Sequence, residues 1–150
     1  MSVTNRRRVT IEWGDCDAAG IVFYPRYFAM FDWSTASLLT AAFGMKKPDW
    51  LRHWKLAGIP MVDTRATFHI ASSFGDEVVI ESRVTEIGRS SFSVHHQLIK
   101  PGPDGAEALA AECWEKRVWS VRDTHDPTRM KGAPVPDEAR LQLGFPPAEA

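Results

Sequence analysis

The 150-residue sequence lacks several features that would place it in a common functional class. Its only cysteines, Cys16 and Cys113, are too few for a disulfide framework and lack the spacing of a metal site. Eighteen basic and nineteen acidic residues leave a net charge of −1, so we expect neither nucleic acid nor a membrane as a partner. No apolar run is long enough to cross a bilayer and no signal peptide is evident, which predicts a cytoplasmic protein.

The residue patterns of several enzyme classes are also missing. The sequence has no Gly-x-Ser-x-Gly elbow of a serine hydrolase and no glycine-rich phosphate loop. Among the five histidines, His95 and His96 alternate faces on a strand, and the others have no partner at metal-ligand spacing. Cys16 lies between two acids, which disfavour a reactive thiolate. We therefore expect no metal site, no cofactor and no cysteine nucleophile.

Hydrophobic residues make up 44% of the chain, enough for the core of a single domain over residues 1–150. Periodicity and turn signals predict helices at 25–43 and 48–57 and strands at 6–13, 59–71, 77–87, 91–99 and 107–121. The prolines that follow predict a mostly irregular tail from about residue 123. One strand, a helix and then four strands joined by short turns indicate an α+β fold.

The helix predicted at 25–43 is the central element of this fold. From Tyr27 onward it carries one charged residue, Asp32, and is otherwise apolar or small. A helix that is apolar nearly all round must be buried, so we expect an antiparallel five-stranded sheet wrapped around it. Asp32 then needs either a local polar partner, such as Ser34 or Thr35, or a task in a binding pocket.

A turn rich in acids and glycines joins the first strand to this helix. Asp15 and Asp17 lie near Gly14 and Gly20, which suit tight turns, and Pro25 suits the first helical position. A carboxylate held there lies just ahead of a helix N-terminus, where free N–H groups and the helix dipole favour developing negative charge. Such a site suits acyl transfer. The alternative is that both acids only accept hydrogen bonds from turn amides.

Residues 15–27 resemble the signature of the hotdog-fold acyl-CoA thioesterases, and they are most similar to the 4-hydroxybenzoyl-CoA thioesterase branch. They read Asp-Cys-Asp-Ala-Ala-Gly-Ile-Val-Phe-Tyr-Pro-Arg-Tyr. The resemblance is dense over residues 9–35 and returns more weakly at residues 75–76 and 88–91. Ala18 departs from it, because the branch tends to have proline there, and this should loosen the turn without removing the acid. The resemblance implies the hotdog fold, a helix wrapped in an antiparallel sheet.

The resemblance also implies roles for residues of the turn. By position, Asp17 matches the family's catalytic carboxylate, acting as nucleophile or general base, and the backbone N–H of Tyr24 matches its oxyanion donor. Gly20, in the same motif, is counted among the substrate-binding residues. Because this family completes its site across a dimer interface, the resemblance implies a homodimer that assembles into a homotetramer.

Four residues are candidates for contacts with the acyl group. Tyr24, Phe28 and Asp32 follow i, i+4, i+8 spacing and share one helix face, which offers a pocket wall. Asp32 is a candidate acceptor for a ring hydroxyl, and Ile59 stands where the 4-hydroxybenzoyl branch offers a hydroxyl side chain. Flat aromatic walls suit an aromatic acyl group, whereas a charged Asp32 disfavours a long fatty chain. Short aliphatic acyl groups stay possible.

Arg89, Ser90 and Ser91 are candidates for contacts with coenzyme A. They follow the strand predicted at 77–87, and the similar branch carries a basic turn at this point. The alternative is that Arg89 is a solvated turn residue with no ligand.

Together these residues predict an acyl-CoA thioesterase that hydrolyses an aromatic or short acyl-CoA to the free acid and coenzyme A. Two other hypotheses compete with this one: a hydratase-type hotdog protein and a non-catalytic module that binds acyl-CoA. The Asp/His pair typical of the hydratase branch is absent from the helix segment. Retention of Asp17 argues against a module without catalytic activity.

Overall fold

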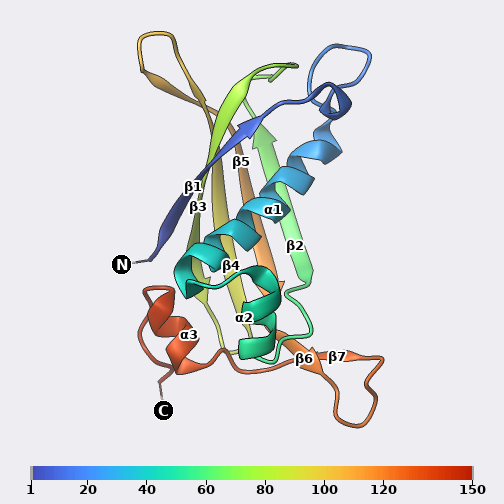
Figure 1. Ribbon diagram of the computed structural model, residues 1–150, viewed down its shortest axis with the longest axis vertical. Helices are drawn as coiled ribbons and strands as arrows, with labels where there is room; N and C mark the ends of the chain where they lie inside the picture. Colours follow the sequence, from blue (N-terminus) through green and yellow to red (C-terminus); the bar gives the residue numbers. More distant parts are fainter. Residues whose placement is uncertain (1, 150) are drawn as a thin grey trace.

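The computed structural model describes residues 2–149 and contains a five-stranded antiparallel sheet that curves around one long helix (Figure 1). The helix, α1, spans Tyr24–Phe43. The strands lie in the order β1 (Thr4–Thr10), β3 (Glu77–Ile87), β4 (Ser91–Pro101), β5 (Glu107–Val118) and β2 (Met61–Phe68). Two shorter helices are α2 (Lys47–His53) and α3 (Asp137–Gln142), and a short 3-10 helix, η1, spans Trp13–Asp15. The strands β6 (Ser120–Arg122) and β7 (Met130–Gly132) form a separate two-stranded sheet. The predicted arrangement of sheet and helix is confirmed.

Alternating residues on the central strands explain why the sheet packs against α1. Every second side chain of a strand points to the same face. The buried residues of this face include Val78, Ile80, Ser82 and Val84 on β3, and Phe92, Val94, His96 and Leu98 on β4. Two of them are polar, and these two, Ser82 and His96, are paired across the strands. The inner face of the sheet is therefore apolar except at its middle.

Helix α1 begins and ends close to where the sequence predicts. Pro25 lies in its first turn, although Tyr24 and not Pro25 is its first residue, and Gly44 ends it in a left-handed conformation with φ of 66°. The expectation that the helix is buried all round is wrong for the single chain, because the sheet covers one side only. Trp33, on the other side, is 69% exposed. Neither α1 nor any other helix within residues 2–149 is long and apolar enough to span a membrane.

The bounds of several other helices and strands differ from the predicted ones by a few residues. The strand predicted at 77–87 is confirmed as β3, while β1, β2, β4 and β5 differ from their predicted bounds by up to three residues. The helix predicted at 48–57 is shorter, since α2 ends at His53 and Lys55 adopts a left-handed φ of 55°. Strand β5 ends at Val118, and the three residues of β6 pair instead with β7.

The C-terminal segment is more ordered than predicted. Within the stretch from residue 123, expected to be mostly irregular, the chain forms β7 and α3. Val135, Ala139 and Leu143 are buried in the same core cluster as the end of α1. Ala139 lies within α3, Val135 lies before it and Leu143 directly follows it, so the segment is held on the core at both ends of the helix. Pro136 in fact precedes the first residue of α3 rather than excluding a helix.

We expect Leu143→Ala to lower the free energy of unfolding by about 2–5 kcal/mol, because it opens a cavity in a packed core. Leu143 is 2% exposed, whereas Leu141, in the adjacent turn, is 59% exposed and supplies a matched control. Leu141→Ala should change the free energy by no more than about 0.5 kcal/mol. Chemical denaturation of both variants measures the difference, and equal effects would contradict the assigned packing of the tail.

Candidate active site

The acid-rich turn between β1 and α1 is a small, well-bonded loop. Cys16 and Val22 form an antiparallel bridge, and the Asp17 N–H donates to the Ile21 carbonyl at 3.1 Å. The loop reverses at Gly20, whose φ of 81° is accessible to glycine at little cost. Further bonds, including the Val22 N–H to the Ser72 carbonyl at 2.9 Å, attach the loop to the segment before β3. The loop is therefore held in one place on the sheet.

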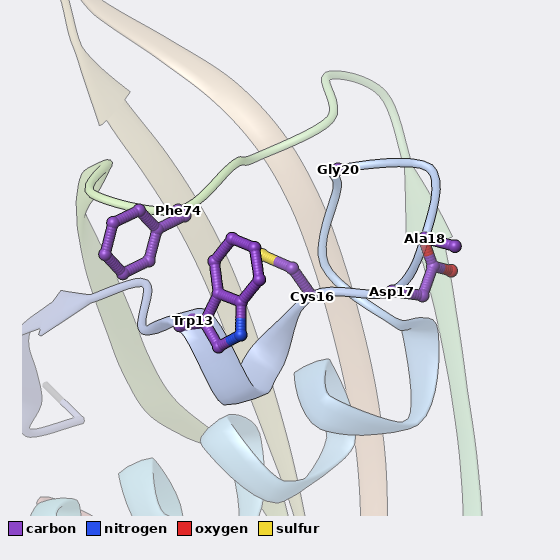
Figure 2. A pocket seen from close by; sticks show the side chains of 6 residues that line it. All are labelled: Trp13, Cys16, Asp17, Ala18, Gly20 and Phe74. Atoms are coloured by element: carbon purple, nitrogen blue, oxygen red, sulfur yellow. The ribbon is translucent and has the colours of Figure 1, made fainter.

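The two acids of this loop have different surroundings. The Oδ2 of Asp15 accepts the Glu12 N–H at 2.9 Å, so Asp15 serves the turn as predicted. The Oδ1 of Asp17 accepts the Ala19 N–H at 2.8 Å, while its Oδ2 has no hydrogen-bond partner within residues 2–149. The Asp17 side chain is exposed, and Figure 2 shows it pointing away from Trp13 and Phe74. One oxygen of Asp17 thus stabilises the turn and the other is free to react.

The N-terminus of α1 lies directly after this loop. The Phe23 N–H donates to the Asp15 carbonyl at 2.8 Å, which holds the start of the helix against the loop. The next amide, that of Tyr24, donates no hydrogen bond within the described part of the chain, as expected for the first residue of a helix. A free N–H at the positive end of the helix dipole suits a negatively charged oxygen.

Two cavities lie beside the loop. One, of about 340 Å³, is lined by Trp13, Cys16, Asp17, Ala18, Gly20 and Phe74 (Figure 2). The rings of Trp13 and Phe74 pack edge to face, 5.7 Å apart, and form its apolar wall. The other cavity, of about 310 Å³, is lined by Ile21, Val22, Tyr24, Tyr27, Phe68, His69, Ile70 and Ala71. Asp17 and Tyr24 therefore line different cavities of the single chain.

The predicted acyl wall is only partly continuous. Phe28 packs edge to face on Phe68, which lines the cavity at Tyr24. Asp32 lies further along the helix, and its side chain is 63% exposed. It bonds neither Ser34 nor Thr35, so the local interpretation of Asp32 is wrong; both hydroxyls donate elsewhere.

The partner of Asp32 is Arg117 on β5, which sequence reasoning missed. The Nη2 of Arg117 donates to Asp32 Oδ1 at 2.7 Å, and its Nη1 donates to the carbonyl of Ile59 at 3.0 Å. Asp32 and Ile59, two predicted acyl contacts, are thus brought together by one guanidinium. A signal was available, because Glu115 and Arg117 are charged residues at inward-facing positions of a strand.

Behind Arg117 lies a layer of four buried polar residues, here called the polar layer: Thr35, Ser82, His96 and Glu115. The Arg117 Nε and the Thr35 hydroxyl both donate to Glu115 Oε1, at 2.8 and 2.6 Å. His96 lies between Ser82 Oγ, 2.6 Å from its Nδ1, and Glu115 Oε2, 3.4 Å from its Nε2. Burial alone would raise the pKa of Glu115, but hydrogen bonds from His96 and Arg117 and their charges outweigh it and lower that pKa to about 2.

The three predicted coenzyme A contacts lie far from the loop in the same chain. Arg89, Ser90 and Ser91 form the turn from β3 into β4, while Asp17 lies near the start of β3 (Figure 1). The ten steps of β3 span about 33 Å at the usual rise of a strand. The Arg89 side chain is exposed, and its carbonyl accepts the Val135 N–H at 2.8 Å. Within residues 2–149 no group of three or more potential metal ligands is present.

The pKa of Glu115 predicts a pH-dependent stability. Because folding lowers this pKa from 4.5 to about 2, Glu115 contributes stability above pH 4.5 that is lost as the pH falls toward 2. The full contribution is on the order of 3 kcal/mol. The unfolding free energies of wild type and Glu115→Gln should therefore converge between pH 5 and pH 2.

The exposed Glu86 on β3 supplies the control, since Glu86→Gln should change the free energy of unfolding by no more than about 0.5 kcal/mol. Chemical denaturation across the pH range measures all three proteins. A difference between wild type and Glu115→Gln that stays constant with pH would contradict the buried, ionised state of Glu115.

Comparison with known proteins identifies the family of the chain. The family model of the Thioesterase-like superfamily matches residues 11–143. The chain is 31% identical over 138 residues to 4-hydroxybenzoyl-CoA thioesterase of Pseudomonas sp. (strain CBS-3), covering 90% of this chain and 92% of that protein. The structure of that enzyme matches with a TM-score of 0.82 at 27% identity, covering 93% of this chain and 98% of the other.

Two further solved structures match over nearly the whole chain. A mutant 4-hydroxybenzoyl-CoA thioesterase complexed with 4-hydroxybenzoyl-CoA gives a TM-score of 0.84 at 27% identity, covering 93% of this chain and 98% of that one. A gentisyl-coenzyme A thioesterase gives 0.73 at 31% identity, covering 91% and 99%. The hotdog fold and the predicted thioester hydrolase are thereby confirmed, and the chain belongs to the Thioesterase-like superfamily.

Proposed function

We propose that the protein hydrolyses an aromatic, 4-hydroxybenzoyl-like acyl-CoA or a short acyl-CoA to the free acid and coenzyme A. One observation carries this proposal. The exposed Asp17 carboxylate, with one unbonded oxygen, lies on a loop that leads into the free N–H of Tyr24 at a helix N-terminus. Hydrolysis of a thioester requires a nucleophile or base and an oxyanion donor, and this loop and the start of the helix supply one of each.

Asp17 has two routes to hydrolysis. As a nucleophile, its free oxygen attacks the thioester carbonyl, the coenzyme A thiolate leaves, and water then cleaves the mixed anhydride to restore the carboxylate. As a general base, it takes a proton from a water molecule that attacks the same carbonyl; the C–S bond then breaks and coenzyme A leaves as the thiolate. In both routes the carbonyl oxygen becomes negative, and the Tyr24 N–H with the helix dipole stabilises that charge.

The length of the α1 face supports a compact aromatic acyl group. Tyr24 and Asp32 are eight residues apart, which is about 12 Å along a helix. A thioester carbonyl, an aromatic ring, a ring hydroxyl and one hydrogen bond at each end fill such a span. Phe28 and Phe68 supply aromatic walls between these ends. A long fatty chain would instead pass the Asp32–Arg117 ion pair and desolvate it.

A second copy of the chain would complete the site. The Arg89 turn and the Asp17 loop lie at opposite ends of the sheet, so one chain does not place a basic turn beside its own carboxylate. The edge strand β2 supports pairing between copies, because nearly all of it is exposed, including Val62 and Phe68. We therefore propose a homodimer, which assembles further into a homotetramer.

Replacing Asp17 tests the proposed function. Asp17→Asn keeps the size of the side chain and an acceptor for the Ala19 N–H, but it removes the nucleophile or base. We expect release of coenzyme A thiol from acyl-CoA to fall by about 10²-fold or more.

Asp15→Asn is the matched control, since it alters the neighbouring acid of the same loop and should have a much smaller effect. Thermal unfolding establishes that both variants are folded. A folded Asp17→Asn protein that turns over substrate at a nearly normal rate would refute the assignment.

Replacing Arg89 tests the proposed contact with the coenzyme A phosphates. Arg89→Ala should raise KM with little change in kcat, because a contact to the nucleotide is the same in the ground state and the transition state. The effect should weaken as salt screens the charges. Arg83→Ala removes another exposed arginine, from the middle of β3, and should leave KM unchanged. If KM is equally insensitive to both changes, Arg89 does not bind coenzyme A.

A further inference from the structure

Arg117 occupies the boundary between the polar layer and the surface. Its side chain is 5% exposed, yet the carboxylate that it contacts on α1, Asp32, is 63% exposed. Three of its five N–H donors are used, by Glu115, Asp32 and the Ile59 carbonyl. The guanidinium thus joins three separate segments: strand β5, helix α1 and the loop before β2.

The polar layer fixes Arg117 from behind. Glu115 is held by Thr35 and by His96, and His96 in turn by Ser82. All four members are at most 3% exposed, so their hydrogen bonds are shielded from water. Because Glu115 can neither turn nor be solvated, it sets the position of the Arg117 Nε. The bond to the Ile59 carbonyl sets the Nη1, and the plane of the guanidinium is then determined.

Stability alone does not account for this arrangement. A buried ion pair gains little over apolar side chains of the same volume, because desolvation of both charges offsets their attraction. The apolar core is in fact divided by the polar layer into two clusters, one around Phe31 and Ile80 and the other around Leu38 and Val84. What the arrangement does provide is one fixed position for the Asp32 carboxylate on the predicted acyl-binding face.

We infer that Arg117 is a positioning residue that makes the acyl pocket selective for a neutral hydroxyl group. This inference rests on the proposed thioesterase function. The Oδ1 of Asp32 is bonded to Arg117, and its Oδ2 has no hydrogen-bond partner within residues 2–149. Two N–H donors of Arg117 are likewise without a partner there. A hydroxyl group can donate to the carboxylate and accept from the guanidinium, whereas an anionic acyl group is repelled by Asp32 and an unsubstituted ring leaves both groups unpaired.

The experiment measures kcat/KM for 4-hydroxybenzoyl-CoA and for benzoyl-CoA, by release of coenzyme A thiol. We expect wild type to prefer the hydroxylated substrate by roughly 10- to 100-fold, the range for a hydrogen bond to a charged group. Arg117→Met removes the guanidinium but leaves Glu115 buried without its cation, which threatens folding. The principal variant is therefore Glu115→Gln with Arg117→Met, which removes both charges together and keeps their volumes.

This double variant should lose most of the preference, bringing the ratio of the two kcat/KM values close to one. The loss should appear in KM for 4-hydroxybenzoyl-CoA, with a much smaller change for benzoyl-CoA. Arg117→Lys should give an intermediate ratio, because one ammonium cannot bond all three partners in the same geometry. Arg83→Met is the matched control: Arg83 is exposed in the middle of β3, and its loss should leave the ratio unchanged.

Several results overturn the inference. If the folded double variant slows both substrates by the same factor, Arg117 has a structural role only. If wild type hydrolyses acyl-CoA esters without preferring the hydroxylated ring, the selectivity does not exist, although the proposed function stands. If wild type releases thiol from no acyl-CoA at all, the proposed function fails and the inference fails with it.

Discussion

Every candidate site residue on α1 takes its position from the packing of one side of this helix on the curved sheet. Tyr27, Phe31 and Leu38 are buried there, and each such side chain contributes about 1.5–3 kcal/mol relative to exposure. Side chains four residues apart share a helix face. Burial of one face of α1 therefore also determines which side chains lie on its other faces. The Tyr24 N–H is thereby held at the end of α1 that follows the loop, and Asp32 is held next to Arg117 on β5.

Apolar packing alone does not fix how far the helix slides along the sheet, because dispersion contacts are only weakly directional. The hydrogen bonds of the polar layer are directional, and they fix the position of α1 along the sheet. Thr35 must reach Glu115 and His96 at once, and a slip of one turn, about 5.4 Å, would bury its hydroxyl without either partner. The same hydrogen bonds that cost desolvation free energy therefore set the position of the helix. We see this as the physical link between the core and the candidate site, since Asp32 and Tyr24 move with Thr35.

The sequence predicted what depends on neighbouring residues and missed what depends on distant ones. Strand β3, the ends of α1 and the hydrogen bond of Asp15 in its turn all follow from local periodicity or turn chemistry. The partner of Asp32 is 85 positions away in the sequence, and although Arg117 stands at an inward-facing strand position, no local pattern pairs it with Asp32. The prediction for the C-terminal segment was wrong for another reason. Its prolines predicted an irregular chain, but Pro136 only precedes the first residue of α3, and buried side chains before, within and after this helix hold the segment on the core.

The two edges of the sheet differ in how well they are protected against pairing with another strand. Edge strand β1 carries three consecutive arginines; Arg6 is paired with Glu81, and Arg7 reaches over α1 to donate to the Met30 carbonyl at 2.9 Å. Charge on this scale discourages another strand from pairing there. Edge strand β2 has no comparable protection along its apolar residues, and it borders the cavity at Tyr24 through Phe68. In the proposed dimer, the copy that covers β2 would therefore close the same cavity from which the helix N-terminus is reached, so that assembly and formation of the site become a single event.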